Sequence, residues 1–184
     1  MAGDATETRK KLLAAATEEF AARGIAGARV DRIAAEAGAN KSLIYSYFGS
    51  KDGLFAAVYD AQVVLTIDAV PFTADDLPGY AARQFDHHRL HPTVQRLTTW
   101  SRLERGTDAS PIEAIASSNI RKITAIEAEQ AAGRLPTRFS AYELLSMVLA
   151  IANMWATGSH QPPGAADIAR QRQSIIDAVK LLIG

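Results

Sequence analysis

The spacing of small and apolar residues between positions 30 and 44 is the feature that most restricts the fold. Ala34 is small enough for two helices to cross closely, and Gly38 supplies the left-handed backbone conformation of a tight turn. Ile33 and Ile44 are then placed to pack inside the angle between the two helices. The segment therefore predicts a helix-turn-helix, with helices of roughly residues 30–37 and 40–48.

Helical periodicity also dominates the rest of the chain, and the alternation typical of β-strands is missing. Asn40 is expected to cap the second helix of the turn, and Asp4, Ser110 and Ser140 precede acidic residues at the spacing of helix starts. Breaks rich in Gly and Pro separate about nine helices. The expected fold class is all-α, with a three-helix module in residues 1–50 and a second helical domain in residues 51–184.

Composition excludes several classes of protein. Of 184 residues, 48% are hydrophobic, which argues against disorder, and 20 basic residues balance 20 acidic ones, so any contact with nucleic acid must come from a local patch. No cysteine is present, which excludes disulfides and thiolate metal sites. The apolar run 144–156 is shorter than the ~20 residues of a spanning helix, and Glu18 and Glu19 interrupt the only leader-like run. A cytoplasmic location away from membranes is expected.

The segment from Ile33 to Leu54, IAAEAGANKSLIYSYFGSKDGL, resembles the signature of the tetracycline-repressor (TetR) family, I-A-x-x-A-G-V-S-x-G-T-L-Y-x-H/Y-F-x-S-K-E-x-L. The match covers residues 8 to 58, and its Tyr-x-Tyr-Phe-x-x-Lys tail is not part of a generic helix-turn-helix. The resemblance implies a sequence-specific, ligand-responsive regulator of transcription. It further implies a repressor that acts as a homodimer on a palindromic operator.

The resemblance also implies which side chains contact DNA. Tyr45, Tyr47 and Lys51 would bind phosphates and fix the recognition helix in the major groove without reading sequence. The alternatives are a half-buried core role for Tyr45 and a solvated surface position for Lys51. Base reading is expected from the exposed first turns of the same helix, where contact with phosphate or water alone is the alternative. The candidates for base reading are Lys41, Ser42, Leu43 and Ser46.

Two residues depart from the family pattern. Where the family commonly has a threonine that caps the first helix of the turn, this chain has Arg29, which cannot cap but can pair with a phosphate. Asp31 suits the dipole of that helix but would repel nearby phosphates. Residues 1–55 contain eight Lys or Arg and seven Asp or Glu, a net charge of +1. The net charge of this segment is too small to attract DNA, so the basic side chains must be gathered on the face that contacts it.

The two C-terminal helices are expected to pair with those of a second copy, as in TetR-like proteins. The helix predicted from Ser140 to Thr157 is apolar almost all round and needs cover on more than one side. A buried helix within a monomer is the alternative. The predicted interface residues are Leu144, Val148, Ile151 and Trp155 on this helix and Ile168, Ile175 and Val179 on the last one.

A ligand site is expected where polar side chains interrupt apolar faces. Trp100 and Glu104 share one helix, and Asn119 lies in the apolar stripe of the next. The alternatives are that Glu104 pairs with an arginine or lies exposed at a helix end, and that Asn119 is a satisfied core amide.

Nothing in the sequence predicts an enzyme, because no phosphate-binding glycine loop or nucleophile elbow is present. His88 and His91 have the spacing of a metal pair but lack a third ligand, so solvated histidines are expected, with no metal or cofactor. The expected partners are double-stranded operator DNA, a small-molecule effector and a second copy of the chain. A small helical enzyme and a protein-interaction module, each with a hairpin that mimics a helix-turn-helix, are the alternatives.

Overall fold

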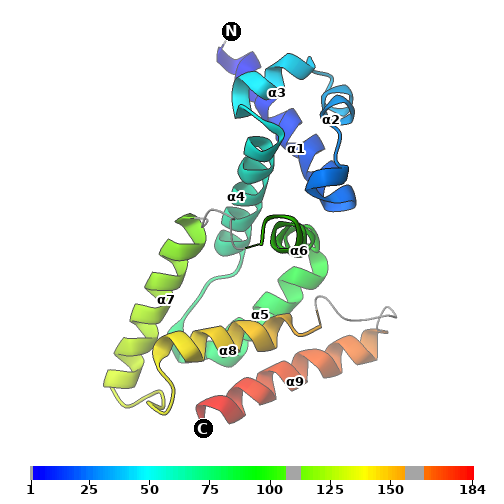
Figure 1. Ribbon diagram of the computed structural model, residues 1–184. Helices are drawn as coiled ribbons and strands as arrows, with labels where there is room; N and C mark the ends of the chain where they lie inside the picture. Colours follow the sequence, from blue (N-terminus) through cyan, green and yellow to red (C-terminus); the bar gives the residue numbers. More distant parts are fainter. Residues whose placement is uncertain (1, 107–112, 156–163) are drawn as a thin grey trace. The chain divides into compact units, whose positions relative to one another are not determined.

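The computed structural model describes residues 2–106, 113–155 and 164–184. Within these ranges the secondary structure is helical throughout, as predicted (Figure 1). The elements are α1 (Ala2–Gly27), α2 (Val30–Glu36), α3 (Lys41–Phe48), α4 (Lys51–Ala69), the short 3-10 helix η1 (Ala74–Asp76), α5 (Leu77–Leu90), α6 (Thr93–Arg105), α7 (Glu113–Ala131), α8 (Ala141–Asn153) and α9 (Ala165–Ile183).

Packing divides the chain into two compact units. The described part of the first unit is residues 2–65 and 93–106, and that of the second is residues 66–92, 113–155 and 164–184. α6 therefore belongs with α1, against which it packs, although 65 residues (28–92) separate the two helices in sequence. The domain boundary predicted near residue 50 differs from this division because sequence periodicity does not show which distant helices meet.

The core of the first unit joins α1 to the helix-turn-helix and to α4. Phe20 of α1 is fully buried and meets Phe55 of α4 edge to face, with 5.2 Å between ring centroids. Ile33 and Ile44 are buried in the same core, as predicted. Because α2 and α3 are too short to be stable alone, this shared core holds them, and each fully buried large side chain contributes about 1.5–3 kcal/mol.

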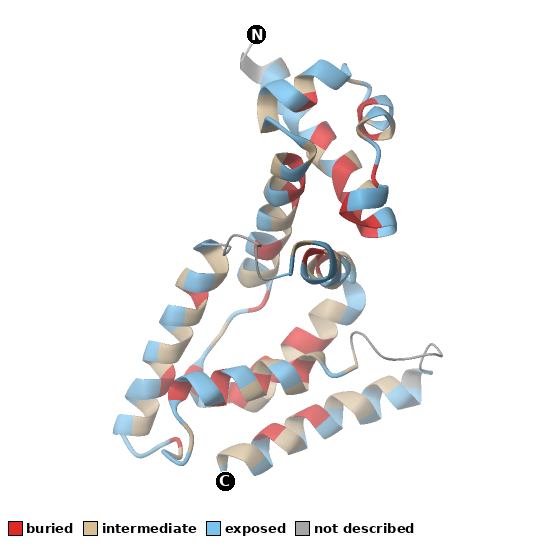
Figure 2. Cartoon of the chain, viewed as in Figure 1, coloured by how far each residue is buried: buried red, intermediate tan, exposed pale blue. Residues whose placement is uncertain are grey.

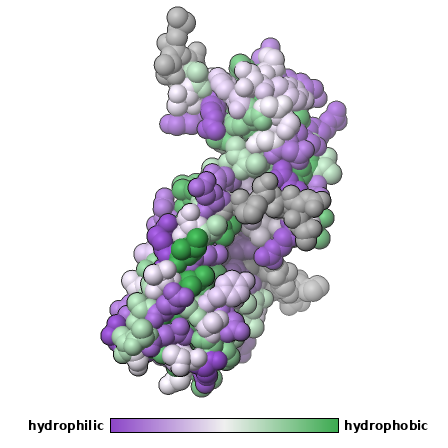
Figure 3. Space-filling model, turned by 60° about the vertical axis from the view of Figure 1, so that its left-hand side comes forward, coloured by the Kyte–Doolittle hydropathy of each residue, from purple (hydrophilic) through white to green (hydrophobic). Residues whose placement is uncertain are grey.

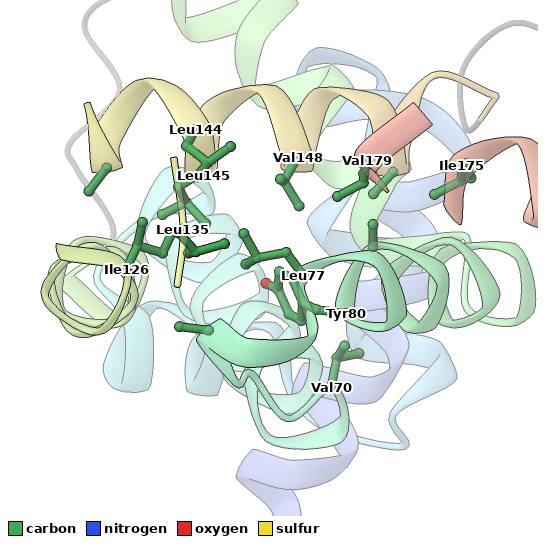
Figure 4. Close-up of a cluster of buried hydrophobic side chains, with 14 of the residues drawn as sticks. Val70, Leu77, Tyr80, Ile126, Leu135, Leu144, Leu145, Val148, Ile175 and Val179 are labelled. Carbon is green, nitrogen blue, oxygen red and sulfur yellow. The ribbon is translucent and has the colours of Figure 1, made fainter. Parts of the chain in front are cut away.

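The core of the second unit is built around α5, which contacts both α8 and α9. Figure 4 shows side chains from these helices and from α7 converging on one apolar cluster. An ion pair adds to this packing, because the Arg172 Nε of α9 donates to the Asp86 Oδ2 of α5 at 2.7 Å. The largest buried members are Leu77, Tyr80, Ile126, Leu144 and Ile175.

The structure confirms the helix starts that were predicted at Asn40 and Ser140. The Asn40 side chain accepts a hydrogen bond from the Ser42 N–H at 2.9 Å and caps α3. Ser140 and Glu143 form the predicted capping box at the start of α8. Asp4 does not mark a helix start, because α1 already begins at Ala2. The side chain of Asp4 and the whole of Ser110 lie outside the described residues.

No single described helix is both long enough and apolar enough to cross a membrane, although α4 and the segment from η1 through α5 pass that test as a bent pair.

Candidate nucleic-acid interface

α3 is held on one side and exposed on the other. Gly38 adopts the left-handed conformation that the turn requires, with φ of 61°, and Ile44 anchors the helix in the core with no exposed surface. Figure 2 shows exposed and intermediate residues along most of the remainder of α3. The exposed residues of α3 are Lys41, Ser42, Tyr45 and Ser46.

The structure sorts the predicted DNA-binding residues by exposure. Four of the predicted residues lie on the exposed face of α3, and Arg29 is exposed just before α2. Leu43 and Tyr47 are half-buried against the core of the first unit. The fully exposed face of α3 therefore offers DNA mainly ammonium, hydroxyl and phenol groups. In the view of Figure 3, hydrophilic and hydrophobic residues are interspersed over the surface.

Lys51 already has partners within the chain. Its Nζ donates to the carbonyl oxygens of Ala26 and Ala28, each at 3.3 Å. These carbonyls lie where α1 ends, so the ammonium satisfies backbone acceptors that the helix leaves open. Lys51 thereby ties the start of α4 to the connection between α1 and α2, a role that the sequence analysis did not foresee.

A glutamate on α1 holds the residue that precedes α2, although it does not accept the hydrogen bonds that a threonine cap would accept. Arg29 makes no side-chain cap, but its backbone N–H donates to Glu19 Oε1 at 2.9 Å, and the Arg32 Nε donates to the same oxygen at 2.8 Å. Burial of Glu19 would raise its pKa, yet these hydrogen bonds and the nearby arginine charges hold the pKa below its usual value. The start of α2 is therefore fixed to α1 by an ionised carboxylate.

Arg9 was missed by the sequence analysis. Its guanidinium lies 5.2 Å from the ring centroid of Phe48, at the end of α3. Lys10 and Lys11 were weighed only as the start of a leader-like segment, and Arg9, which completes the basic run 9–11, was not considered. In the structure this run belongs to the helix that supports α3, and the three residues are exposed.

The predicted ligand residues are not brought together in one unit. Glu104 accepts hydrogen bonds from the backbone N–H groups of Ile25 and Ala26, at 3.0 and 2.6 Å, and Trp100 Nε1 donates to the carbonyl of Ala21 at 3.3 Å. Both side chains therefore fasten α6 to α1 within the first unit. Asn119 lies half-buried on α7 in the second unit.

The contact between α6 and α1 lies beside a break in α1. Gly24 has φ of 72° and ψ of −178°, a combination that residues with a Cβ rarely adopt. The helical turn that follows begins with backbone N–H groups that lack acceptors in the preceding helix. Glu104 supplies those acceptors from α6, so the break and the α1–α6 contact depend on each other.

The predicted dimer residues divide into two groups. Leu144, Val148, Ile175 and Val179 are fully buried within one chain. Because a side chain with no exposed surface in one protomer has none for a second, the structure assigns these four to the core of the second unit. Ile151, Trp155 and Ile168 are half-buried. The large apolar residues most exposed on α9 and on or just after α8 are Leu181, Tyr142 and Met154.

Three polar side chains of α5, those of Tyr80, Gln84 and His88, lie one turn apart in the second unit and form a polar row. Gln84 Nε2 donates to the Tyr80 hydroxyl at 2.8 Å. Gln84 Oε1 and, one turn later, His88 Nδ1 are buried and have no hydrogen-bond partner among the described residues. His88 also forms a hydrogen bond with Asn153 of α8. The prediction of solvated histidines therefore does not hold for His88, whose side chain is half-buried and whose Nδ1 is buried.

The burial of His88 predicts a loss of stability in mild acid. Desolvation, reinforced by the charge of His87, lowers the pKa of His88 from 6.5 to about 4, so the unfolded chain binds this proton first as the pH falls. Above pH 6.5 the imidazole is mostly neutral in both the folded and the unfolded chain, so the full stability of the folded protein is retained. As the pH falls from 6.5 to 4, the unfolded chain gains the proton while the folded chain does not, and the free energy of unfolding decreases. Chemical denaturation should show the free energy of unfolding falling by about 2 kcal/mol between pH 7 and 4.5. His88→Gln should flatten this profile, whereas parallel profiles for the two proteins would contradict the assignment.

Within the described parts of the chain, no group of three or more His, Asp or Glu side chains is placed to hold a metal ion.

Comparison with known proteins agrees with this geometry. Residues 12–58 match the family model for bacterial regulatory proteins of the tetR family, and residues 76–180 match the tetracyclin repressor-like C-terminal domain. The HTH-type transcriptional repressor SCO4008 of Streptomyces coelicolor is 42% identical over 84% of this chain and 81% of its own length. The repressor NicS of Pseudomonas putida is 31% identical over 72% of this chain and 68% of its own length.

A solved structure shows the same fold over nearly the whole chain. The transcriptional regulator SCO4942 of Streptomyces coelicolor superposes with a TM-score of 0.81 at 34% identity, covering 95% of this chain and 97% of its own. With both parts of the chain matched and an exposed, capped recognition helix in place, the protein belongs to the tetR family of DNA-binding transcriptional regulators.

Proposed function

We propose that the protein is a repressor that binds a palindromic operator as a homodimer in the cytoplasm and responds to a small-molecule effector. The observation that supports this proposal is the exposed face of α3. Lys41, Ser42, Tyr45 and Ser46 line its exposed face, and their ammonium, hydroxyl and phenol groups can donate to phosphates and base edges. In a dimer, two such helices would meet half-sites about one turn of DNA (~34 Å) or a multiple apart.

Replacement of both Tyr45 and Lys51 by alanine tests this docking. We expect the double variant to bind all duplexes more weakly, with a salt dependence flatter by about one unit of slope for each lysine lost. Fluorescence anisotropy of labelled duplexes across a salt series measures both effects. Because Lys51 also holds the end of α1, thermal melting must show that the variant is folded. An unchanged affinity in the folded variant would remove the phosphate assignment.

We place the dimer contact on the outward faces of α8 and α9, because their inward faces are covered by the chain itself. Tyr142 and Leu181 are 67% and 81% exposed. They lie at the same end of the second unit, since Arg138, shortly before α8, donates to the carbonyl of Leu181. Exposed apolar residues on helices whose other face is buried are typical of an interface between subunits.

Replacement of Leu181 by aspartate should convert the dimer to monomer without unfolding it. The new charge would be buried against a partner but solvated in a single chain, so association is penalised selectively. Sedimentation velocity measures the change. Leu103→Asp on α6, which alters a residue of the same type that is 72% exposed, is the matched control and should leave the dimer intact. A variant at Leu181 that sediments as a dimer would place the interface elsewhere.

We place the effector in the second unit, beside the polar row of α5. Small-molecule sites combine apolar walls with a few convergent polar groups, and Gln84 Oε1 and His88 Nδ1 offer two acceptors one turn apart. A coupling of about 1–3 kcal/mol between effector and DNA would be enough to switch operator occupancy. A thermal-shift screen of small molecules, repeated with Gln84→Leu, tests this: a hit that stabilises both proteins equally would place its site elsewhere.

A further inference from the structure

The lysine that begins the recognition helix is paired with an acidic side chain on the neighbouring helix. Lys41 is the first residue of α3, and Asp31 lies in the first turn of α2. Lys41 Nζ and Asp31 Oδ1 are 2.8 Å apart, and both side chains remain accessible, at 47% and 62%. The pair therefore forms on the surface that faces DNA in the proposed complex.

The surroundings keep both partners charged. The hydrogen bond and charge of Asp31 raise the pKa of Lys41, and the same contact lowers the pKa of Asp31. The other groups that act on the pair are Arg29, which lowers the pKa of both partners, and Tyr45, which raises that of Lys41. The interaction is thus an ion pair throughout the neutral range.

This pairing changes what Lys41 can do at a DNA surface. A free ammonium is attracted to any phosphate, and such contacts supply binding that is independent of sequence. To reach a phosphate, Lys41 must either leave Asp31 or bring that carboxylate close to the phosphate, and both are unfavourable. A guanine edge in the groove is different, because the ammonium has three donors and can keep Asp31 while it donates to O6 or N7.

We propose that Asp31 is a specificity-determining residue, which restrains Lys41 so that it contributes to binding at chosen base pairs and little at random phosphates. The inference rests on docking through α3 and does not depend on the dimer or the effector. Asp31 acts through Lys41 and is a positioning residue. A purely structural role at the start of α2 would change folding stability and leave the choice between DNA sequences unaltered.

The experiment compares Asp31→Asn with Glu36→Gln, which removes the same charge from an exposed position of the same helix. Two labelled duplexes serve as probes: a 30-base-pair duplex of random sequence, and one enriched by selection on the wild-type protein. We expect Asp31→Asn to bind the random duplex about three- to tenfold more tightly, with a salt slope steeper by about 0.9 for each lysine released. Its preference for the selected duplex should fall, while Glu36→Gln should behave as wild type.

Lys41→Gln separates this restraint from direct repulsion between Asp31 and phosphate. In the Lys41→Gln background, Asp31→Asn should no longer tighten binding to the random duplex. If the tightening persists there, or if Asp31→Asn leaves both affinities unchanged, Asp31 does not act through Lys41 and the inference is wrong. Lys41→Gln alone also tests docking separately, because it should weaken binding to the selected duplex whether or not Asp31 restrains the lysine.

Discussion

Gly24→Ala should lower the free energy of unfolding by about 3 kcal/mol, an unusually large effect for a single methyl group. Two costs add together. The backbone at Gly24 lies in a region that only glycine enters readily. In addition, a Cβ there would overlap Glu104 Oε1 and lie 2.9 Å from Trp100 Cε3, so the contact between α1 and α6 must shift. Urea denaturation of the variant and the wild type measures the difference.

Gly38→Ala is the matched control for this variant. Gly38 also has a positive φ, of 61°, but a Cβ at this position meets nothing within 4 Å. Only the backbone cost applies, and we expect a loss of about 1 kcal/mol. Equal losses for the two variants would show that α6 does not close tightly over the break in α1.

Ser46→Glu should reduce affinity for duplex DNA by about a hundredfold or more. Ser46 is exposed on the docking face of α3, where a carboxylate would lie among phosphates, and like charges brought together at an interface cost several kcal/mol. The loss should be seen with every duplex and should shrink as salt is added. Fluorescence anisotropy at two salt concentrations measures it.

Ala22→Glu is the control for the added charge. Ala22 is exposed on α1 and is not part of the proposed contact surface, so this variant should lose far less affinity. Thermal melting of both variants checks folding. Similar losses for the two would mean that net charge alone governs binding and that α3 holds no special position.

The local features of the fold could be predicted from the sequence because they depend on neighbouring residues. Gly38 sets the turn, Asn40 caps α3 and Ser140 begins α8 through short-range hydrogen bonds whose partners lie two or three residues away. The family signature, from Ile33 to Leu54, includes Gly38 and Asn40 and identifies the same helix-turn-helix. The helix-turn-helix and the all-α fold were therefore foreseen in detail.

Features that depend on distant residues could not be predicted in this way. Periodicity shows that Leu144 and Val148 lie on an apolar face but not that α5 of the same chain covers it. Glu104 accepts from amides 78 and 79 residues away, and nothing in its own helix indicates the break at Gly24. The pairing of Asp31 with Lys41 likewise follows from the angle between two helices.

Amide hydrogen exchange of the full chain, with and without a saturating amount of the selected duplex, tests most directly whether α3 enters the DNA groove. DNA should slow exchange across residues 40–50 and leave the core helices of the second unit little changed. Unaltered exchange in residues 40–50 under saturating DNA would contradict the account.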